Sequence, residues 1–311
     1  MYQGRRVAAV VPAYKEARHI AEVIRRMPQW IDDIVVVDDC SDDDTARVAV
    51  DVGDARVQVI RNPQRQGVGG ATVAGWRQAL AVNADIAVKV DGDGQMAPER
   101  IGELLAPLIE QNYDYAKGNR FLDTVALRQM PPVRLLGNFL LTFLTKLASG
   151  YWSIFDPQNG FVAITADALR RLDLDRLTRD FFFENDVLIH LNVHSCRVKD
   201  VAIPAQYGSE ESKLRIERVL FTFPWSLFKG FWFRVYEKYV VRDFSAIGVF
   251  WCAGAPLLTW GVAFGLYTWA KSIATGHVST TGTVMLSVLP FLVGFQLVLQ
   301  AIILEIRESP R

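Results

Sequence analysis

Two carboxylates separated by a single glycine are the clearest chemical feature of this 311-residue sequence. They form the triplet Asp91-Gly92-Asp93, which directly follows the apolar run 85–90. Like charges a few ångströms apart repel each other unless a cation or a ligand compensates them. Mg2+ or Mn2+ would do so, because such ions take oxygen ligands from protein and phosphate together. The triplet, with Gln95 as a further candidate ligand, therefore predicts a divalent metal shared with a diphosphate, whereas an ordinary turn is the competing interpretation.

The residues before and after this triplet alternate between apolar strands and helices. Strands are predicted at 5–12, 33–38, 56–60 and 85–90, with the first strand ending at Pro12, and a helical pattern carries Ile20, Val23, Ile24 and Met27. This alternation predicts an α/β fold with a doubly wound, mostly parallel sheet. Ligands of such sheets bind beyond the carboxyl ends of the strands. Asp38, Asp39 and Asp91 are expected at that edge.

The second half of the predicted domain has a less regular pattern. Helices are expected near 99–111 and 133–149, and short strands near 114–118 and 160–164. The glycine-rich segment 67–71 would either let the backbone approach a nucleotide or simply begin the helix that follows.

The composition excludes several classes of protein. Half of the residues are hydrophobic and 22% are charged, which is not the composition of a disordered chain. The formal net charge is zero, so nothing favours nucleic acid as the main partner. The cysteines at positions 40, 196 and 252 fit neither a disulfide framework nor a zinc site, and they suit a reducing compartment.

The C-terminal part of the chain is strongly apolar. Lys271 is the sole charged residue between 244 and 304. A helix needs about 20 apolar residues to cross the hydrocarbon core of a membrane, and 246–270 and 284–304 both qualify. The alternative is a buried helical hairpin of a soluble protein, which would need a large partner surface to cover every face.

Basic residues flank these two predicted spans. The basic residues before the first span are Arg215, Arg218, Lys229, Arg234, Lys238 and Arg242. Arg307 and Arg311 follow the second span, and the connecting loop offers only Lys271 and His277. The positive-inside rule then predicts that both termini and the domain at 1–240 are cytoplasmic.

Aromatic and basic side chains interleave over 214–242. That composition predicts amphipathic helices in the headgroup region, broken at Pro224; stacking on nucleic acid is the competing interpretation. The predicted organisation is a domain at 1–213, juxtamembrane helices at 214–243 and a two-helix membrane region at 244–306. Paired helices of this kind also make a homo-oligomer plausible.

A series of motifs runs through the predicted domain. The segments are VVPAYKE (10–16), VVVDDCSDDDT (35–45), GVGGA (67–71), VDGDGQMAPE (90–99), KGNRF (117–121), DPQNGF (156–161), FFFENDVLIHL (181–191) and YGSEESKL (207–214). In order and spacing they resemble family 2 inverting glycosyltransferases, which have a GT-A nucleotide-sugar domain. With the C-terminal spans, the chain is similar to polyprenyl-phosphate glycosyltransferases, including dolichyl-phosphate mannose synthases and undecaprenyl-phosphate glucosyltransferases.

The resemblance implies a set of residues for the nucleotide-sugar donor. Pro12, Tyr14 and Glu16 would lie in the loop that holds base and ribose, and Asp39 would contact the same part of the nucleotide. Tyr14 could instead be packing, and Glu16 an acid favoured by a helix dipole. Asp91, Asp93 and Gln95 would bind the metal and diphosphate. Relatives often carry an apolar residue before the glutamine, which leaves the role of Gln95 open.

The resemblance also implies residues for the phosphate of a lipid acceptor. Arg120 and Arg134 match positions that receive this phosphate, and Lys213 with Ser212 is a further candidate pair. An arginine fork supplies both the charge and the geometry that a phosphate needs. Surface ion pairing is the alternative role for the two arginines.

The acceptor decides whether catalysis needs a base. A sugar hydroxyl requires one as it attacks, whereas a polyprenyl phosphate is already ionised, so the enzyme mainly aligns two phosphates and offsets their repulsion. Asp93 would act through the metal. Asp156 and Glu184 would either act as a base or orient the sugar hydroxyls, and Asp186 is a third candidate. Asp156 could instead be an ordinary turn residue. His190 and His194 have no third ligand nearby and are interpreted as structural.

Together these features predict transfer of one hexose, with inversion, from a UDP- or GDP-sugar to polyprenyl phosphate. Two spans suggest a bacterial inner membrane and undecaprenyl phosphate, with the catalytic domain on the cytoplasmic face. The alternatives are transfer to a hydroxyl of a lipid-linked glycan, and a non-enzymatic nucleotide-sugar-binding scaffold. The sequence does not identify the sugar.

Overall fold

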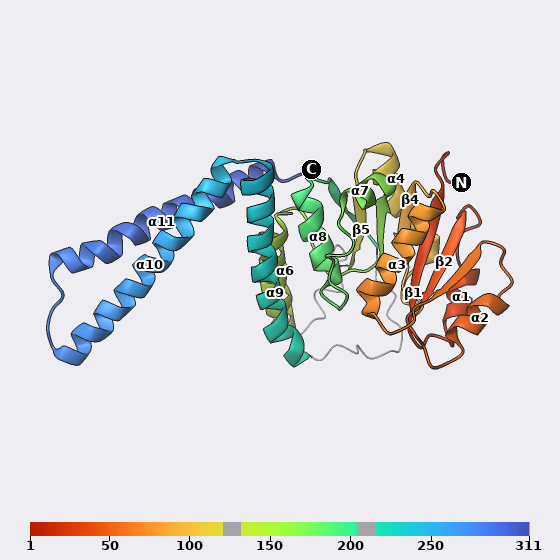
Figure 1. Ribbon diagram of the computed structural model, residues 1–311, viewed down its shortest axis with the longest axis horizontal. Helices are drawn as coiled ribbons and strands as arrows, with labels where there is room; N and C mark the ends of the chain where they lie inside the picture. The colour runs from red at the N-terminus through yellow and green to blue at the C-terminus, as the bar shows by residue number, and fades with distance from the viewer. Residues whose placement is uncertain (121–131, 204–215, 311) are drawn as a thin grey trace. The chain divides into compact units, whose positions relative to one another are not determined.

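The computed structural model describes residues 1–120, 132–203 and 216–310 (Figure 1). The described chain forms two compact units, Met1–Gly230 and Phe231–Ser309. The first unit contains the sheet and the second a helical hairpin.

In the described part of the chain, seven strands form one sheet in the order β3-β2-β1-β4-β6-β5-β7. The strands are β1 (Val7–Ala13), β2 (Asp33–Asp38), β3 (Val57–Arg61), β4 (Ile86–Lys89), β5 (Tyr115–Asn119), β6 (Val162–Thr165) and β7 (Val198–Ala202). Strands β3, β2, β1 and β4 are parallel neighbours, and β5 is parallel to β7. Only β6 in this described sheet runs antiparallel to its neighbours, β4 and β5. The predicted mostly parallel sheet is confirmed.

Helices cover both faces of the sheet (Figure 1). Helices α1 (Ile20–Arg25), α2 (Thr45–Asp51) and α4 (Ile101–Glu110, after a short 3-10 turn at Pro98–Arg100) pack on one face. Helices α3 (Gly67–Ala81), α7 (Ala166–Arg171) and α8 (Phe183–Val193) pack on the other, and α6 (Pro132–Ser149) contacts α8. Because both faces are covered, β1 and β2 are buried at every position, which fits the apolar sequence of β1 and the apolar centre of β2 between Asp33 and Asp38.

Two predicted boundaries are wrong. Strand β1 does not end at Pro12 but continues to Ala13, so Pro12 lies in the strand rather than in the following loop. Proline has no N–H to donate to the ladder, but Pro12 lies beyond the last paired residues of β1 and β4, Val10 and Lys89, and its carbonyl accepts from the Gly92 N–H at 3.2 Å. The glycine-rich segment is itself the first turn of α3, which begins at Gly67.

The glycines of that first turn allow a close approach of backbone to backbone. Gly67 has φ +79°, and a Cβ at Gly67 or Gly69 would collide with the backbone of Thr178 or Arg179. The Gly69 N–H also donates to the Arg179 carbonyl at 3.1 Å. The close approach shown here is to the segment that precedes α8. The glycines also begin α3, as the helix-initiating interpretation predicts, and an approach to a nucleotide stays a prediction.

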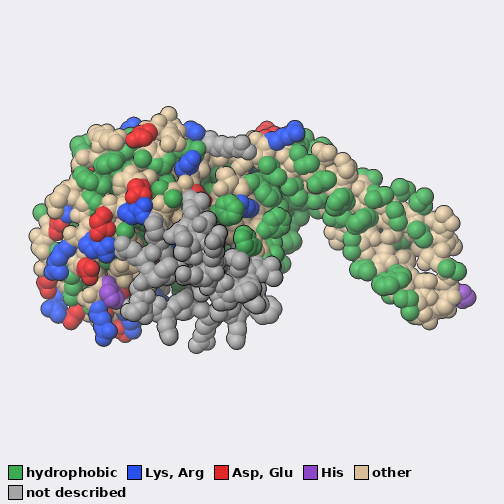
Figure 2. Space-filling model, turned by 180° about the vertical axis from the view of Figure 1, so that it is seen from behind, with side chains coloured by type: hydrophobic (Ala, Val, Ile, Leu, Met, Phe, Trp, Pro, Cys, Tyr) green, Lys and Arg blue, Asp and Glu red, His purple; other side chains and the backbone are tan. Residues whose placement is uncertain are grey.

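The second unit contains the two apolar C-terminal helices. Helices α10 (Ala246–Thr275) and α11 (Thr281–Glu308) include both predicted spans and are long and apolar enough to cross a membrane. Only 28% and 11% of their most apolar windows are buried, and Figure 2 shows hydrophobic side chains over this face of the hairpin. The helices pack closely on each other, since a Cβ at Gly261 would lie 2.6 Å from the Phe291 nitrogen. A bilayer would cover the outward apolar surface that the described residues leave exposed.

Helix α9 (Ile216–Tyr236) corrects the prediction of a break at Pro224, because it continues through that residue into a π-helical turn at Glu237–Arg242. Phe223, Leu227 and Phe231 follow at intervals of four and are buried. This buried stripe stabilises the helix across the missing hydrogen bond of the proline.

Arg234 also departs from its expected place among headgroup-facing basic residues. Its side chain is fully buried and pairs with Glu305 of α11 at 3.1 Å. The Trp251 indole N–H of α10 donates to the same carboxylate at 3.1 Å. Through Glu305, Arg234 therefore links the C-terminal end of α9 to α10 and α11 instead of facing lipid headgroups.

Candidate active site

The topology brings the predicted site residues to one edge of the sheet. Strands β1, β2, β4 and β5 run in the same direction, so their carboxyl ends share this edge. Strand β6 runs the opposite way, so the loop 156–160 reaches the same edge from its amino end. Tyr14, Asp39, Asp91 and Arg120 all follow strands that end here.

Asp39 organises the loop in front of α3. It is 3% exposed, and its Oδ1 accepts hydrogen bonds from Asn62 Nδ2 and from the Gln66 N–H, both at 2.8 Å. Its Oδ2 accepts from the Gly67 N–H, also at 2.8 Å. Asp39 thus fixes the loop at the binding edge, and its contact with a nucleotide stays a prediction.

Tyr14 and Glu16 lie at the end of β1. The Arg65 guanidinium lies over the Tyr14 ring at 4.0 Å from its centroid, an arrangement suited to cation–π attraction. Glu16 is buried, and its Oε2 lies 3.1 Å from His19 Nδ1. Lys15 between them has φ +60°, a left-handed conformation that non-glycine residues adopt mainly where the surroundings enforce it.

Asp91 and Asp93 lie at the carboxyl end of β4. Asp91 Oδ1 is 2.7 Å from Lys89 Nζ. Asp93 Oδ1 accepts a hydrogen bond from the Gln95 N–H at 3.0 Å, while the Gln95 side chain is exposed. The backbone of Gln95 therefore shapes the turn, and a ligand role for its side chain stays a prediction.

Lys89 connects this triplet to Glu184. It is 1% exposed, and its Nζ lies 3.2 Å from Glu184 Oε1 as well as 2.7 Å from Asp91. Burial alone would lower the pKa of Lys89, but Asp91 and Glu184 raise it above its ordinary value, so the ammonium stays charged. Gly160 leaves room for this contact, because a Cβ there would meet Lys89 Nζ at 2.5 Å.

Sequence reasoning missed Lys89, although a signal was present. It is the one charged residue inside the apolar run 86–90, two positions before Asp91. Residues two apart on a strand point to the same side. Burying a charged lysine there costs much free energy unless it has an acidic partner nearby, and Asp91 and Glu184 supply two.

These residues fit a divalent cation that is shared with a ligand. Asp91 and Asp93 follow β4, and Glu184 of α8 shares the ammonium of Lys89 with Asp91, so carboxylates gather at this end of the strand. Within the described ranges, no three His, Cys, Asp or Glu side chains form a complete metal cage. Magnesium typically takes one or two carboxylates and completes its shell with phosphates and water, so the incomplete donor set suits that mode.

Asp156 and Arg120 form the second half of the site. Asp156 is 2% exposed, has φ +49°, and its two oxygens accept from Arg120 Nε and a terminal nitrogen, each at 2.7 Å. Burial raises the pKa of Asp156, but the hydrogen bonds and charge of Arg120, with help from Lys117, outweigh it and hold this pKa below its ordinary value. The Arg120 side chain remains 42% exposed, so solvent can reach it.

The remaining predicted site residues are less fully described. Arg134 lies in the first turns of α6, but its side chain is outside the described part of the structure. Ser212 and Lys213 lie outside the described residues altogether. Asp186 accepts hydrogen bonds from the Thr178 N–H and hydroxyl at 2.8 Å, a contact that anchors the segment before α8.

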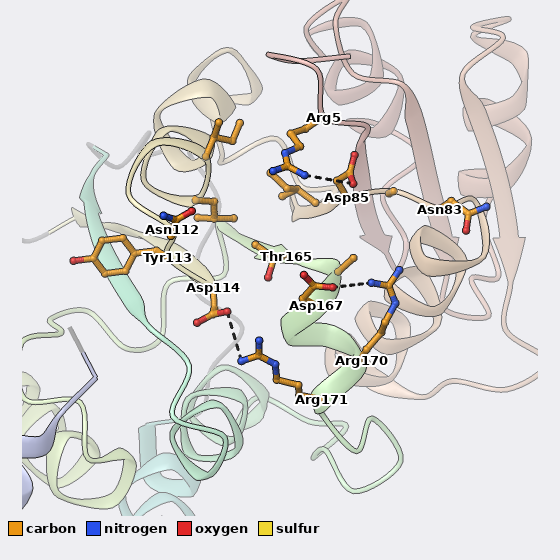
Figure 3. A pocket seen from close by; sticks show the side chains of 15 residues that line it. Arg5, Asn83, Asp85, Asn112, Tyr113, Asp114, Thr165, Asp167, Arg170 and Arg171 are labelled. Atoms are coloured by element: carbon orange, nitrogen blue, oxygen red, sulfur yellow. Dashed lines mark hydrogen bonds and ion pairs between the residues drawn. The ribbon is translucent and has the colours of Figure 1, made fainter.

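A cavity of 390 Å³ lies at the opposite edge of the sheet (Figure 3). Its arginines and aspartates pair with one another, as in Arg170–Asp167 at 2.9 Å and Arg171–Asp114 at 3.9 Å. It is lined by the amino end of β4 and the carboxyl end of β6, so it is separate from the edge that carries Asp91 and Arg120.

The sequence matches the family described as "Glycosyl transferase family 2" over residues 8–173, more than half of the chain. The chain belongs to this family. It is therefore a glycosyltransferase, and the residues described above lie within or just after the matched segment.

Relatives in the family act on lipid phosphates. The chain is 30% identical over 229 residues to a UDP-N-acetylglucosamine--dolichyl-phosphate N-acetylglucosaminyltransferase of Methanococcus voltae, with 69% of this chain and 90% of the relative covered. It is 28% identical to an undecaprenyl-phosphate mannosyltransferase of Micrococcus luteus, with 64% and 82% covered.

A solved structure supports the fold. Glucosyl-3-phosphoglycerate synthase from Mycobacterium tuberculosis, in complex with Mn2+, UDP-glucose and phosphoglyceric acid, is 22% identical with a TM-score of 0.53. The match covers 74% of this chain and 80% of that one. The likeness confirms the GT-A fold predicted from the sequence.

The Arg120–Asp156 pair predicts a pH-dependent loss of stability in Arg120→Ala. The pKa of Asp156 is lower in the folded protein than its value of about 3.9 in the unfolded chain. The ion pair with Arg120 therefore stabilises the fold above about pH 3.9, and this contribution is lost as the pH falls through the folded-state pKa of Asp156. Without Arg120, burial disfavours the carboxylate, so the variant is penalised increasingly as pH rises. We expect a deficit of about 2 to 3 kcal/mol at neutral pH, because a charged hydrogen-bonding group loses its partner.

Melting temperatures of the two proteins at pH 4.5 and 7.5 check this expectation. The gap between wild type and Arg120→Ala should widen at the higher pH. Arg170→Ala is the matched control, because its partner Asp167 is 78% exposed and needs no compensation. A gap for Arg120→Ala that is the same at both pH values would contradict the assigned role of the pair.

Proposed function

We propose that the protein transfers one hexose, with inversion, from a UDP- or GDP-sugar to polyprenyl phosphate at a membrane surface. The observation that carries the proposal is the pairing of two half-sites at one sheet edge. Asp91 and Asp93 form one, Arg120 and Asp156 the other, and the loop 156–160 runs between them. The lipid-phosphate relatives support this choice of acceptor.

The donor half would hold a divalent metal through Asp91 and Asp93. When bound, Mg2+ or Mn2+ would neutralise charge on the leaving diphosphate. Lys89 Nζ lies 2.7 Å from Asp91 Oδ1 and would hold this carboxylate in place, and it forms an ion pair with Glu184 at the same time. Tyr14, Glu16 and the loop fixed by Asp39 are proposed to surround the nucleotide.

The acceptor half would receive the lipid phosphate at Arg120. A phosphate oxygen would attack the anomeric carbon of the sugar as the bond from that carbon to the diphosphate breaks, releasing a nucleoside diphosphate. No proton has to be removed, since the phosphate is already ionised. This suits a site in which the two candidate bases, Asp156 and Glu184, are each held by a cation.

The alternative acceptor, a glycan hydroxyl, would require one of these carboxylates to take up a proton. The lowered pKa of Asp156 makes it a poor base at neutral pH. We therefore expect Glu184→Gln to retain measurable transfer to polyprenyl phosphate.

The decisive experiment is incubation of the purified full chain with undecaprenyl phosphate in detergent and a panel of labelled UDP- and GDP-sugars. We expect one sugar to appear in the organic-soluble fraction as an acid-labile phosphate ester, and only when Mg2+ or Mn2+ is added. Label that appears only in water-soluble glycan, or none with any donor, would overturn the proposal.

The two apolar helices would anchor the enzyme in the membrane that contains its acceptor. We propose the bacterial inner membrane, with the catalytic domain on the cytoplasmic face, following the distribution of basic residues. Protease accessibility of an N-terminal tag in sealed inverted vesicles tests this orientation.

A further inference from the structure

A buried ion pair beneath the acceptor half has no part in the reaction described so far. Lys117 of β5 and Asp200 of β7 are direct neighbours in the register of the two parallel strands. Lys117 is 1% exposed and Asp200 12%, and Lys117 Nζ lies 3.6 Å from Asp200 Oδ1. Burying two ionisable side chains next to each other in a sheet costs desolvation free energy that their mutual attraction need not offset, which suggests a specific role for the pair.

Both residues bind the same short stretch of backbone. Lys117 Nζ donates to the carbonyls of Phe155, at 3.1 Å, and of Asp156. Asp200 Oδ2 accepts from the Phe155 N–H at 2.6 Å and from Asn119 Nδ2 at 2.8 Å. The Phe155 residue is therefore held on its N–H by a carboxylate and on its carbonyl by an ammonium.

The stretch that they hold needs such support. Asp156 adopts a left-handed backbone conformation, with φ +49°, which is disfavoured for a residue other than glycine. In this conformation its carboxylate lies against Arg120, with both oxygens bonded to the guanidinium. The chain of contacts thus runs from Lys117 and Asp200 through the Phe155–Asp156 backbone to Arg120.

We propose that Lys117 and Asp200 are positioning residues for the acceptor phosphate, acting through Asp156 on the orientation of Arg120. The inference rests on the proposed function, in which Arg120 receives the lipid phosphate. It predicts a selective defect: binding of the acceptor weakens, whereas binding of the donor at Asp91 and Asp93 does not. A pair that merely stabilised the sheet would not separate the two substrates.

The test variant is the double substitution Lys117→Met with Asp200→Asn. Removing both charges avoids leaving one buried and unpaired, which could unfold the protein. Lys117→Arg keeps the charge and the donors and serves as the conservative variant. Arg56→Met is the matched control, because Arg56 also donates to loop carbonyls, those of Pro28 and Ile31, but at the far edge of the sheet.

KM values are measured for undecaprenyl phosphate and for the sugar nucleotide that the wild-type chain uses. In the double variant we expect the acceptor KM to rise about tenfold or more, the size of effect typical of lost supporting contacts. The donor KM should stay within about twofold of wild type, Lys117→Arg should recover part of the loss, and Arg56→Met should behave as wild type.

A second measurement isolates the route through Arg120. If Lys117 and Asp200 act through it, adding the double substitution to Arg120→Ala causes no further rise in acceptor KM. A full additional rise in that background, or an unchanged acceptor KM in the double variant, overturns the inference. Wild-type protein that transfers no sugar to any polyprenyl phosphate would instead refute the proposed function, so the two failures are distinct.

Discussion

Asp93→Ala is expected to lower the rate of sugar transfer by about three orders of magnitude. Asp93 follows the end of β4 and is one of two carboxylates proposed to hold the metal at the diphosphate. Loss of metal at a leaving group removes several kcal/mol of transition-state stabilisation, and about 4 kcal/mol corresponds to a thousandfold in rate. Initial rates with the preferred sugar nucleotide, measured across a Mn2+ titration, provide the test.

The folded state of Asp93→Ala should remain intact, because Asp93 lies in the turn after β4 and is only partly buried. Its melting temperature should therefore stay near that of wild type without metal, and only the wild type should gain stability from Mn2+ with UDP or GDP. Asp167→Ala, an exposed aspartate at the opposite edge, is the control and should lose nothing. Transfer by Asp93→Ala within tenfold of wild type would refute the metal role.

The sequence was sufficient to predict the sheet edge that carries the site. Apolar runs that end in Asp38 and Asp91 indicate parallel strands and place both residues at one edge. The antiparallel insertion of β6 could not be inferred, because strand direction depends on long-range pairing that a short run such as 160–164 does not encode. Yet β6 is what brings the loop 156–160, and with it Asp156, between β4 and β5.

Contacts between side chains were the least predictable part. The sequence marked Arg120, Asp156 and Glu184 as separate candidates, but not that Arg120 binds Asp156 or that Glu184 binds Lys89. Such pairs join residues 36 and 95 positions apart, and a single sequence contains no signal that links them. The predicted helix break at Pro224 was wrong for a related reason. Tertiary packing of Phe223 and Leu227 overrides the local tendency of proline to end a helix.

Lys89→Met should damage both stability and activity at the donor half, whereas Asp93→Ala should lower activity alone. The ammonium is 1% exposed and is the near partner of Asp91 and Glu184. Removing one member of a buried ion pair costs about 3 to 5 kcal/mol, because the remaining charge is left uncompensated. In a domain of this size we expect the melting temperature to fall by about 10 °C, and transfer to fall by about 10- to 100-fold as Asp91 loses its support.

The double variant Lys89→Met with Glu184→Gln separates charge balance from simple loss of packing. If the uncompensated carboxylates cause the damage, removing the Glu184 charge should restore about 1 to 3 kcal/mol of stability relative to Lys89→Met alone. Activity should recover less, because Asp91 still lacks the ammonium 2.7 Å from its Oδ1. Lys199→Met, which removes an exposed lysine from β7, is the matched control. A double variant no more stable than Lys89→Met would show that packing, rather than the charge of this buried lysine, holds the end of β4 in place.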